Sequence, residues 1–245
     1  MHNGIHYEPI LVALSYVISV LGSYTALQLA IAIPQARGRL VALGWVIGAA
    51  TALGGGAIWS MHFIAMNAAD MGMPVSYDAR LTFASLLMGI AASAIGLYVV
   101  GRGEGSTGKL LMSGVVTGLG VALMHYTGMA AMLMPAKIDY DPTLFYGSLV
   151  IAVVAATVAL WLAFNLRGNL QRFGSAIVMG IAVCGMHYTG MYAVRMTPAA
   201  EPTASGISLP PATLGQSVFI VSAIVLVLLL AFGAWKSQRS VMADL

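Results

Sequence analysis

Long apolar runs dominate this chain and limit what it can fold into. A helix needs about 20 apolar residues to cross the hydrocarbon core of a bilayer. Seven runs meet that length, and they cover residues 9–33, 40–66, 80–101, 109–134, 143–166, 173–196 and 214–235. Each run is continuously apolar and lacks the alternation of an outer-membrane barrel strand. The sequence therefore predicts an all-α, polytopic membrane protein with seven transmembrane helices.

The composition excludes an ordinary soluble domain. Only 8% of the 245 residues are charged and 60% are hydrophobic, whereas soluble domains carry about 25% charged residues. The net charge of +3 is spread through the connecting segments, so no nucleic-acid partner is predicted. The N-terminal "MHNGIHYEP" lacks the basic start of a signal peptide, and the apolar run after it is too long for one. The first run is therefore predicted to be retained as a membrane span.

Positive charges predict the orientation of the spans. Eight of the 11 Lys and Arg residues fall in alternate connecting segments and the C-terminal segment: Arg37, Arg39, Arg102, Lys109, Arg167, Arg172, Lys236 and Arg239. The other segments hold three basic residues, Arg80, Lys137 and Arg195, and six acids, Glu8, Asp70, Asp78, Asp139, Asp141 and Glu201. Lys and Arg concentrate on the cytoplasmic side of membrane proteins. We therefore expect an inner-membrane protein with its N-terminus outside and its C-terminus in the cytoplasm.

The chain also contains an internal repeat. His62, His125 and His187 are separated by 63 and then 62 residues. Each period contains two predicted spans, so the repeating unit is a helical hairpin, and the seventh helix follows three such units. Because each unit crosses the membrane twice, the three histidines enter the bilayer in the same direction. We expect them at one depth, about one helical turn inside the outer face.

Each histidine belongs to the pattern Met-His-[Phe/Tyr]-x-x-Met. The three copies begin at Met61, Met124 and Met186. Residues four apart lie on one face of a helix, which pairs His62 with Met66, His125 with Met129 and His187 with Met191. Imidazole and thioether together favour copper, since zinc normally takes thiolate or carboxylate ligands beside histidine. The alternative is a set of histidines that only hydrogen-bond to neighbouring helices, but ionisable groups inside a bilayer are usually functional.

Other residues of the motifs are secondary candidates for the same site. The methionine before each histidine, Met61, Met124 and Met186, points about 100° away from the His face and is a less favoured ligand. Tyr126, Tyr188, Thr127 and Thr189 are predicted either to orient the imidazoles or to hydrogen-bond between helices. Cys184 precedes His187 by three residues and is either an additional ligand or a small buried apolar residue. The Gly54–Gly56 run and "GVVTGLG" (residues 114–120) are typical of close helix packing.

At these residues the chain resembles the MHYT family of bacterial integral membrane sensor domains. Met124–Thr127 and Met186–Thr189 spell the family's motif, and Trp59–Met66 is similar to its first copy. The resemblance implies a copper site near the outer face that responds to a diatomic gas, O2, CO or NO. It also implies cytoplasmic diguanylate cyclase and cyclic-di-GMP phosphodiesterase modules, in cis or in trans.

The resemblance suggests a division of the chain. Residues 1–235 form the predicted sensor domain, and residues 236–245 form a cytoplasmic tail. We expect the tail to be the junction to an output domain of a longer protein, and the less favoured alternative is a stand-alone form. The sensor itself is predicted not to be an enzyme. Whether the chain forms a homodimer is an open question. Two alternative functions are also open: a haem electron carrier with two histidines on the iron, and a metal transporter. The transporter is disfavoured because the His and Met residues lie at a single depth.

Overall fold

Seven long helices make up the fold. The computed structural model describes residues 5–102, 106–166, 168–199 and 207–243, and in these it contains seven helices that are long and apolar enough to cross a membrane. Six of the spans are single helices: α1 (Pro9–Ala30), α4 (Ala79–Arg102), α5 (Thr107–Ala130), α6 (Pro142–Asn165), α7 (Asn169–Tyr192) and α8 (Pro211–Ala243). The second span is continuous but is wound in three parts: α2 (Arg39–Ala50), a π-helix η1 (Thr51–Trp59) and α3 (Ser60–Ala68). The prediction of seven membrane helices is confirmed.

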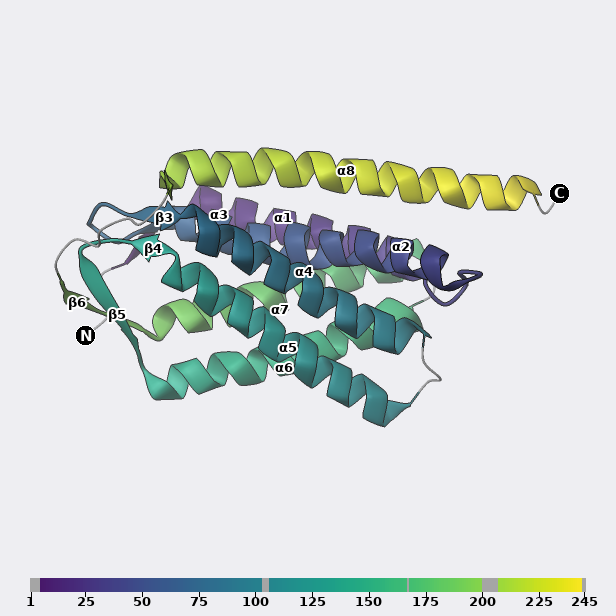
Figure 1. The fold of residues 1–245 in the computed structure, drawn as a ribbon, viewed down its shortest axis with the longest axis horizontal. Coiled ribbons are helices and arrows are strands. Elements are labelled where there is room, and N and C mark those ends of the chain that lie inside the picture. The colour runs from purple at the N-terminus through teal and green to yellow at the C-terminus, as the bar shows by residue number, and fades with distance from the viewer. Residues whose placement is uncertain (1–4, 103–105, 167, 200–206, 244–245) are drawn as a thin grey trace.

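Helix α8 differs from the other spans in how little of it is covered. It lies along the outside of the bundle (Figure 1) and packs against α1, α3 and η1. Only 11% of its most apolar window is buried, against 61% for the second span. Helix α8 continues beyond residue 235 to Ala243, so the predicted tail begins as part of the same helix. Arg167, Glu201 and residues 244–245, which the sequence analysis also used, lie outside the described residues.

Glycines allow several helices to approach closely. A Cβ atom on Gly56 would lie 2.7 Å from the Leu226 side chain on α8, and one on Gly118 would lie 2.5 Å from the Val153 backbone on α6. A Cβ on Gly54 would overlap the Gly89 carbonyl on α4. Such contacts are available only to residues without side chains. The prediction that these glycines serve close helix packing is confirmed.

In the described part of the chain, seven short strands cover one end of the bundle, which we call the strand end. They are β1 (His6–Tyr7), β2 (Ala69–Asp70), β3 (Ser76–Asp78), β4 (Met132–Leu133), β5 (Ala136–Tyr140), β6 (Val194–Pro198) and β7 (Ser208–Leu209). All pairings are antiparallel: β1 with β2, β3 with both β4 and β7, and β5 with β6. In the last pair, Ala136 lies opposite Pro198 and Tyr140 opposite Val194.

These strands correct two predicted helix ends. The fourth and sixth spans were expected to reach residues 134 and 196, but α5 ends at Ala130 and α7 at Tyr192. Pro135 cannot donate the hydrogen bond that a continuing helix needs. After α7 the chain instead forms β6, which pairs with β5. The apolar runs continue past the helix ends because these strands are themselves partly buried.

Charged residues separate between the two ends of the bundle. Every Asp and Glu in the described part of the chain lies at the strand end, in or beside a strand. The opposite end, which we call the basic end, carries Arg37, Arg39, Arg102, Lys109, Arg172 and Lys236. The two ends therefore offer quite different chemical environments.

Candidate metal centre

The three motif histidines lie on three different spans, close to the strand end. His62 is on α3, His125 on α5 and His187 on α7, each five or six residues before its helix ends. All three are buried, with exposed fractions of 1%, 0% and 0%. Their nearly equal distance from the helix ends follows from the repeat, as the spacing predicts.

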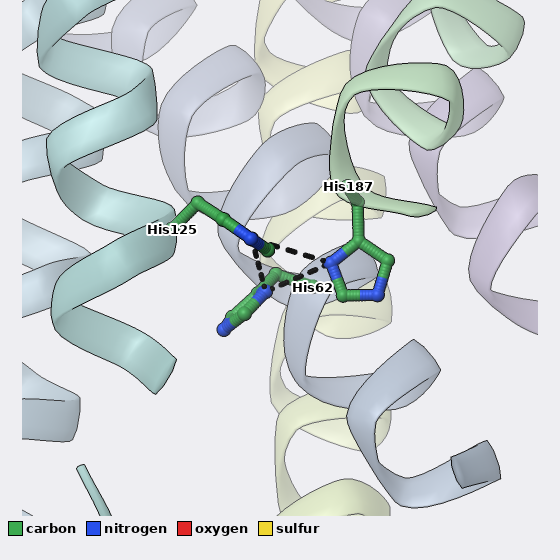
Figure 2. Close-up of side chains that lie close together, drawn as sticks. All are labelled: His62, His125 and His187. Carbon is green, nitrogen blue, oxygen red and sulfur yellow. Dashed lines mark hydrogen bonds between the residues drawn. The ribbon is translucent and has the colours of Figure 1, made fainter. Parts of the chain in front are cut away.

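The structure brings the three imidazoles together through one nitrogen of each ring. The Nδ1 atom of His62 lies 3.0 Å from that of His187 and 3.1 Å from that of His125. The remaining Nδ1–Nδ1 distance, between His125 and His187, is 3.4 Å. The rings stand nearly perpendicular to one another, at 77–89°, and point to a common centre (Figure 2). We call this arrangement the Nδ1 triangle.

Hydrogen bonds alone do not satisfy the Nδ1 triangle. Three bonds around it would require each Nδ1 atom to donate to one neighbour and accept from another. An imidazole nitrogen carries either a hydrogen or a lone pair in the plane of the ring. At least one pair of nitrogens would then face each other with two lone pairs or two hydrogens. Three lone pairs directed at one point are instead the arrangement that a cation stabilises.

The dimensions of the triangle fit a metal ion. Zinc–imidazole bonds are about 2.0–2.1 Å long, so nitrogens at tetrahedral angles around such an ion lie about 3.3–3.4 Å apart. The observed separations are 3.0, 3.1 and 3.4 Å. Among the Cys, His, Asp and Glu residues that the structure describes, these three histidines are the group placed to hold a metal ion. The chain's own residues therefore meet the geometric requirement for a metal centre with three imidazole ligands.

Two glycines let the imidazoles reach this position. A Cβ atom on Gly190 would lie 2.5 Å from Nε2 of His125, and one on Gly128 would overlap Nε2 of His62. His62 and His125 therefore each pack against the backbone of the next motif, three residues after that motif's own histidine. The sequence analysis missed this role, although both glycines stand at the same place in the two "MHYTGM" copies. The first motif has Ala65 at that place.

Close packing surrounds the Nε2 side of the three imidazole rings. The Nε2 atoms of His62, His125 and His187 are buried and have no hydrogen-bond partner among the described residues. Buried polar atoms usually have a partner. The orientation of the three rings therefore depends on close packing, including the contacts with Gly128 and Gly190, rather than on a hydrogen bond to each Nε2.

The motif methionines are all buried. Their exposed fractions do not exceed 2% in Met61, Met66, Met124, Met129, Met186 and Met191. Met124 packs toward α4, where its Cγ atom would lie 3.4 Å from a Cβ on Gly89. Met186 lines a separate apolar cavity. Coordination by Met66, Met129 and Met191 stays a prediction.

The hydroxyl groups of the motifs make other hydrogen bonds. Tyr126 Oη lies 2.7 Å from Ser148 Oγ on α6, and Thr127 Oγ1 donates to the Met88 sulfur on α4 at 3.6 Å. Thr189 Oγ1 donates to the Gly185 carbonyl of its own helix. Tyr188 contacts Tyr7 edge to face. Tyr126 and Thr127 thus hydrogen-bond between helices, whereas Thr189 bonds within its own helix. A role of these residues in orienting the imidazoles stays a prediction.

Cys184 lies apart from the histidine group. Its thiol is half-buried, and it is not among the potential ligand atoms that lie within 4.8 Å of one another. Burial without such neighbours is typical of a cysteine that serves as a small apolar residue.

An apolar cavity lies between η1, α5, α6 and α7. Its volume is about 40 Å³, and its lining includes Ile58, Val121, Ala152, Met179 and Met186. A cavity needs about 10–15 Å³ of this kind of volume to hold one water molecule, and apolar cavities stay dry and take up apolar guests. The cavity thus offers space for a molecule of a few atoms, and Met186 in its lining precedes His187 in the sequence.

A family model matches three segments of the chain. Described as MHYT, a bacterial signalling protein N-terminal repeat, it matches residues 55–113, 118–176 and 180–243. Each matched segment contains one motif histidine. The three-fold repeat that the histidine spacing predicts is thereby confirmed.

Curated relatives are larger signalling proteins. The chain is 42% identical over 237 residues to the bifunctional diguanylate cyclase/cyclic di-GMP phosphodiesterase MucR of Pseudomonas aeruginosa, which covers 95% of this chain and 34% of MucR. It is 35% identical over 227 residues to the signaling protein YkoW of Bacillus subtilis, covering 90% of this chain and 28% of YkoW. The cyclic di-GMP phosphodiesterase NbdA of P. aeruginosa is 36% identical over 203 residues, covering 80% of this chain and 26% of NbdA. The chain thus spans about a third or less of these relatives. No solved structure matches it.

Proposed function

Because this chain belongs to the MHYT family of bacterial signalling proteins, we propose that it is a membrane sensor module that binds copper between its three motif histidines. The Nδ1 triangle is the observation that carries this proposal. Three buried imidazoles with their lone pairs directed at one point form a site for a soft or borderline metal ion.

Copper is preferred over zinc because of the other residues of the three motifs. Three imidazoles alone also occur at catalytic zinc sites, so the histidines do not decide the metal. The buried thioethers of Met66, Met129 and Met191 favour copper, and every described carboxylate lies in or beside the strands. Bound copper would supply an open coordination position for a small ligand. The protein would hold the ion through Nδ1 of His62, His125 and His187.

The ligand that we propose is a diatomic gas, O2, CO or NO. Such molecules are small and apolar and enter the hydrocarbon region of a membrane readily. An apolar cavity is lined by Met186, the residue that precedes His187. Its apolar lining suits a diatomic gas and disfavours water or ions.

The signal would pass to cyclic-di-GMP enzymes. MucR and NbdA, by their names, make or degrade this nucleotide, and each extends well beyond the part that this chain matches. We propose that this module acts on such domains in cis or in trans and has no enzymatic activity itself. In this proposal the N-terminus and the strand end face outward from the inner membrane. The basic end, with the C-terminal end of helix α8, faces the cytoplasm.

The geometry does not favour the alternative of a haem electron carrier. Two axial histidines would approach the iron from opposite faces of a porphyrin. Here all three Nδ1 atoms lie within 3.4 Å of one another, which leaves no plane between them for the macrocycle. A metal transporter would need ligands at several depths, and the described cluster lies at a single depth.

Metal analysis of the purified protein tests the proposal. After mild chelation, copper should exceed zinc and iron, and infrared absorption of added CO should change on the copper-loaded protein. Removing all three imidazoles in a His62→Ala/His125→Ala/His187→Ala variant should abolish both signals. Zinc as the retained metal would contradict the copper assignment. Stoichiometric iron with a haem spectrum would replace the sensor hypothesis with the electron carrier.

A further inference from the structure

A second cavity opens at the basic end, far from the histidines. Its volume is about 810 Å³, and it lies between α1, α2, α7 and α8. Three cationic side chains line it: Arg37 from the α1–α2 connection, Arg172 from α7 and Lys236 from α8. Its lining contains no Asp or Glu, and the described carboxylates lie at the opposite end of the bundle. A cavity lined by charges of one sign concentrates counter-ions.

Arg172 is held in place and still has a free donor. Its Nη1 atom donates to Gln28 Oε1 and to Asn169 Oδ1, both at 2.8 Å. Its Nε atom is buried and has no partner. A buried donor without a partner is uncommon, so the positive charge of this guanidinium is incompletely compensated by the protein. Guanidinium groups bind phosphate through two parallel N–H bonds, and this one has been positioned in advance.

The cavity lies at the level where the membrane spans end. Its lining includes Ile31 and Ala32, directly after α1, and Val41, at the start of α2. Lys236 is the first charged residue of α8 and directly follows its apolar run. Leu29 and Leu230 form apolar walls on the side of the bundle interior. The cationic side chains of such a cavity suit the headgroup of a phospholipid. Its apolar walls suit the glycerol and the first acyl carbons.

We propose that this cavity binds the phosphate of an anionic phospholipid headgroup. Basic pockets between membrane helices on the cytoplasmic side are suited to such headgroups. The phosphate chemistry is shared with free inorganic phosphate. The membrane is the source that we assign, because the apolar walls have no function toward a fully hydrated ion.

Binding there would connect helix α8 to the rest of the bundle. Lys236 belongs to α8, whereas Arg37 and Arg172 belong to the α1–α2 connection and α7. At this end α8 makes apolar contacts with its neighbours: the Phe232 and Trp45 ring centroids lie 5.7 Å apart, and Gly233 packs close to Leu29. A phosphate that contacts all three cations would therefore hold the end of α8 by charge. This inference is independent of the metal at the other end.

Native mass spectrometry of the full chain tests the proposal. The protein would be released from vesicles of equal parts phosphatidylcholine and phosphatidylglycerol, and retained lipid counted. We expect retained phosphatidylglycerol, and about fivefold weaker retention in each of the variants Arg37→Gln, Arg172→Gln and Lys236→Gln, because a basic residue near a membrane surface contributes about 1 kcal/mol. Lys109→Gln is the matched control, since it removes one charge from the same end outside the cavity. It should change retention less than about twofold.

Three results would overturn the proposal. An equal loss in Lys109→Gln would mean general attraction to the surface rather than a site. Equal retention of phosphatidylcholine would remove the role of the headgroup charge. Displacement of the lipid by millimolar inorganic phosphate, with equal thermal stabilisation in detergent, would assign the cavity to the free ion. If Arg172→Gln fails to fold, Arg37→Gln and Lys236→Gln remain, because both of these side chains are exposed and their loss removes little packing.

Discussion

At the strand end, three imidazoles turn their Nδ1 atoms toward one another with no exposed surface. At the basic end, Arg37, Arg172 and Lys236 line an open cavity, and the Nε donor of Arg172 has no partner. Each set of polar groups lacks a ligand, and the two missing ligands have opposite charge. The first set presents lone pairs when its Nδ1 atoms carry no hydrogen, and it is then complementary to a cation. The second set presents only N–H donors and is complementary to an anion. The sign of the missing ligand follows from which kind of hydrogen-bonding group is in excess.

The two ends also differ in how the chain builds them. The Nδ1 triangle takes one residue from the same place in each repeat, so its symmetry follows from the sequence. The basic cavity combines α1, α2, α7 and α8, which hold no common place in the repeat. A change at one end should therefore leave the ligand of the other end unaffected, and the predictions below test that separation.

The largest effect is expected from single histidine changes. His125→Ala should remove copper almost completely, with at least about tenfold weaker binding, because one centre is shared by three ligands. Double and triple histidine variants should be little worse, since residues that act as one unit are not additive. Metal content is measured by elemental analysis, and Lys236→Gln should leave it unchanged. Equal stepwise losses across the single, double and triple variants would show three independent sites.

A methyl group added at the edge of the triangle should have the next largest effect. In Gly190→Ala, the new Cβ would lie 2.5 Å from His125 Nε2, so the imidazole must move away from the other two. We expect most of the copper to be lost while the helix content stays the same by circular dichroism. Gly185→Ala is the matched control on the same helix, because a Cβ there meets no atom within 4 Å. Similar copper contents in the two variants would contradict the proposed packing of His125.

A smaller effect is expected from the thioethers. Met129→Leu keeps the volume of a fully buried side chain but removes the sulfur, and such swaps are well tolerated in cores. If Met129 completes the copper site, the variant should bind copper roughly tenfold more weakly, while its thermal stability changes little. The same comparison applies to Met66→Leu and Met191→Leu. Unchanged copper affinity in all three would restrict the site to the imidazoles.

The smallest effect concerns the strands that cover the metal centre. Burial, followed by the nearby Tyr126, raises the pKa of Tyr140 to about 12, whereas an unfolded tyrosine has a pKa of about 10. The folded state therefore keeps its proton longer, and its stability should fall as pH rises from about 10 to 12. Tyr140→Phe cannot ionise and should reduce this alkaline loss in thermal midpoint. An unchanged pH profile in that variant would show that Tyr140 does not contribute.

The repeat explains why much of the strand end could be predicted. Long apolar runs gave the seven spans, and the spacing of His62, His125 and His187 gave their common depth. Distances of 3.0–3.4 Å between nitrogens depend on helix rotation, which spacing alone does not determine. The roles of Gly128 and Gly190 depend on contacts between repeats and were missed for the same reason. The β5–β6 pairing joins residues about 60 positions apart, so no local pattern indicates it.

The basic cavity was not predictable from the sequence in the same way. The charges of Arg37, Arg172 and Lys236 were read only as a sign of orientation. Arg172 is fixed by Gln28, which is 144 residues away in the chain. A cavity formed by non-repeated helices has no signature in any one segment, and the structure was needed to show which of the eight basic residues face a common space.

The π-helical part of the second span has a consequence for the rotation of His62. Residues Thr51–Trp59 close wider turns than an α-helix does, so they advance by a smaller angle per residue than the α2 and α3 segments on either side. If these nine residues rewound as α-helix, every residue after them would turn about the helix axis relative to α2. The His62 side chain would then point away from His125 and His187. The direction in which the His62 side chain points is therefore set by the winding of a glycine-rich segment that begins eleven residues before it.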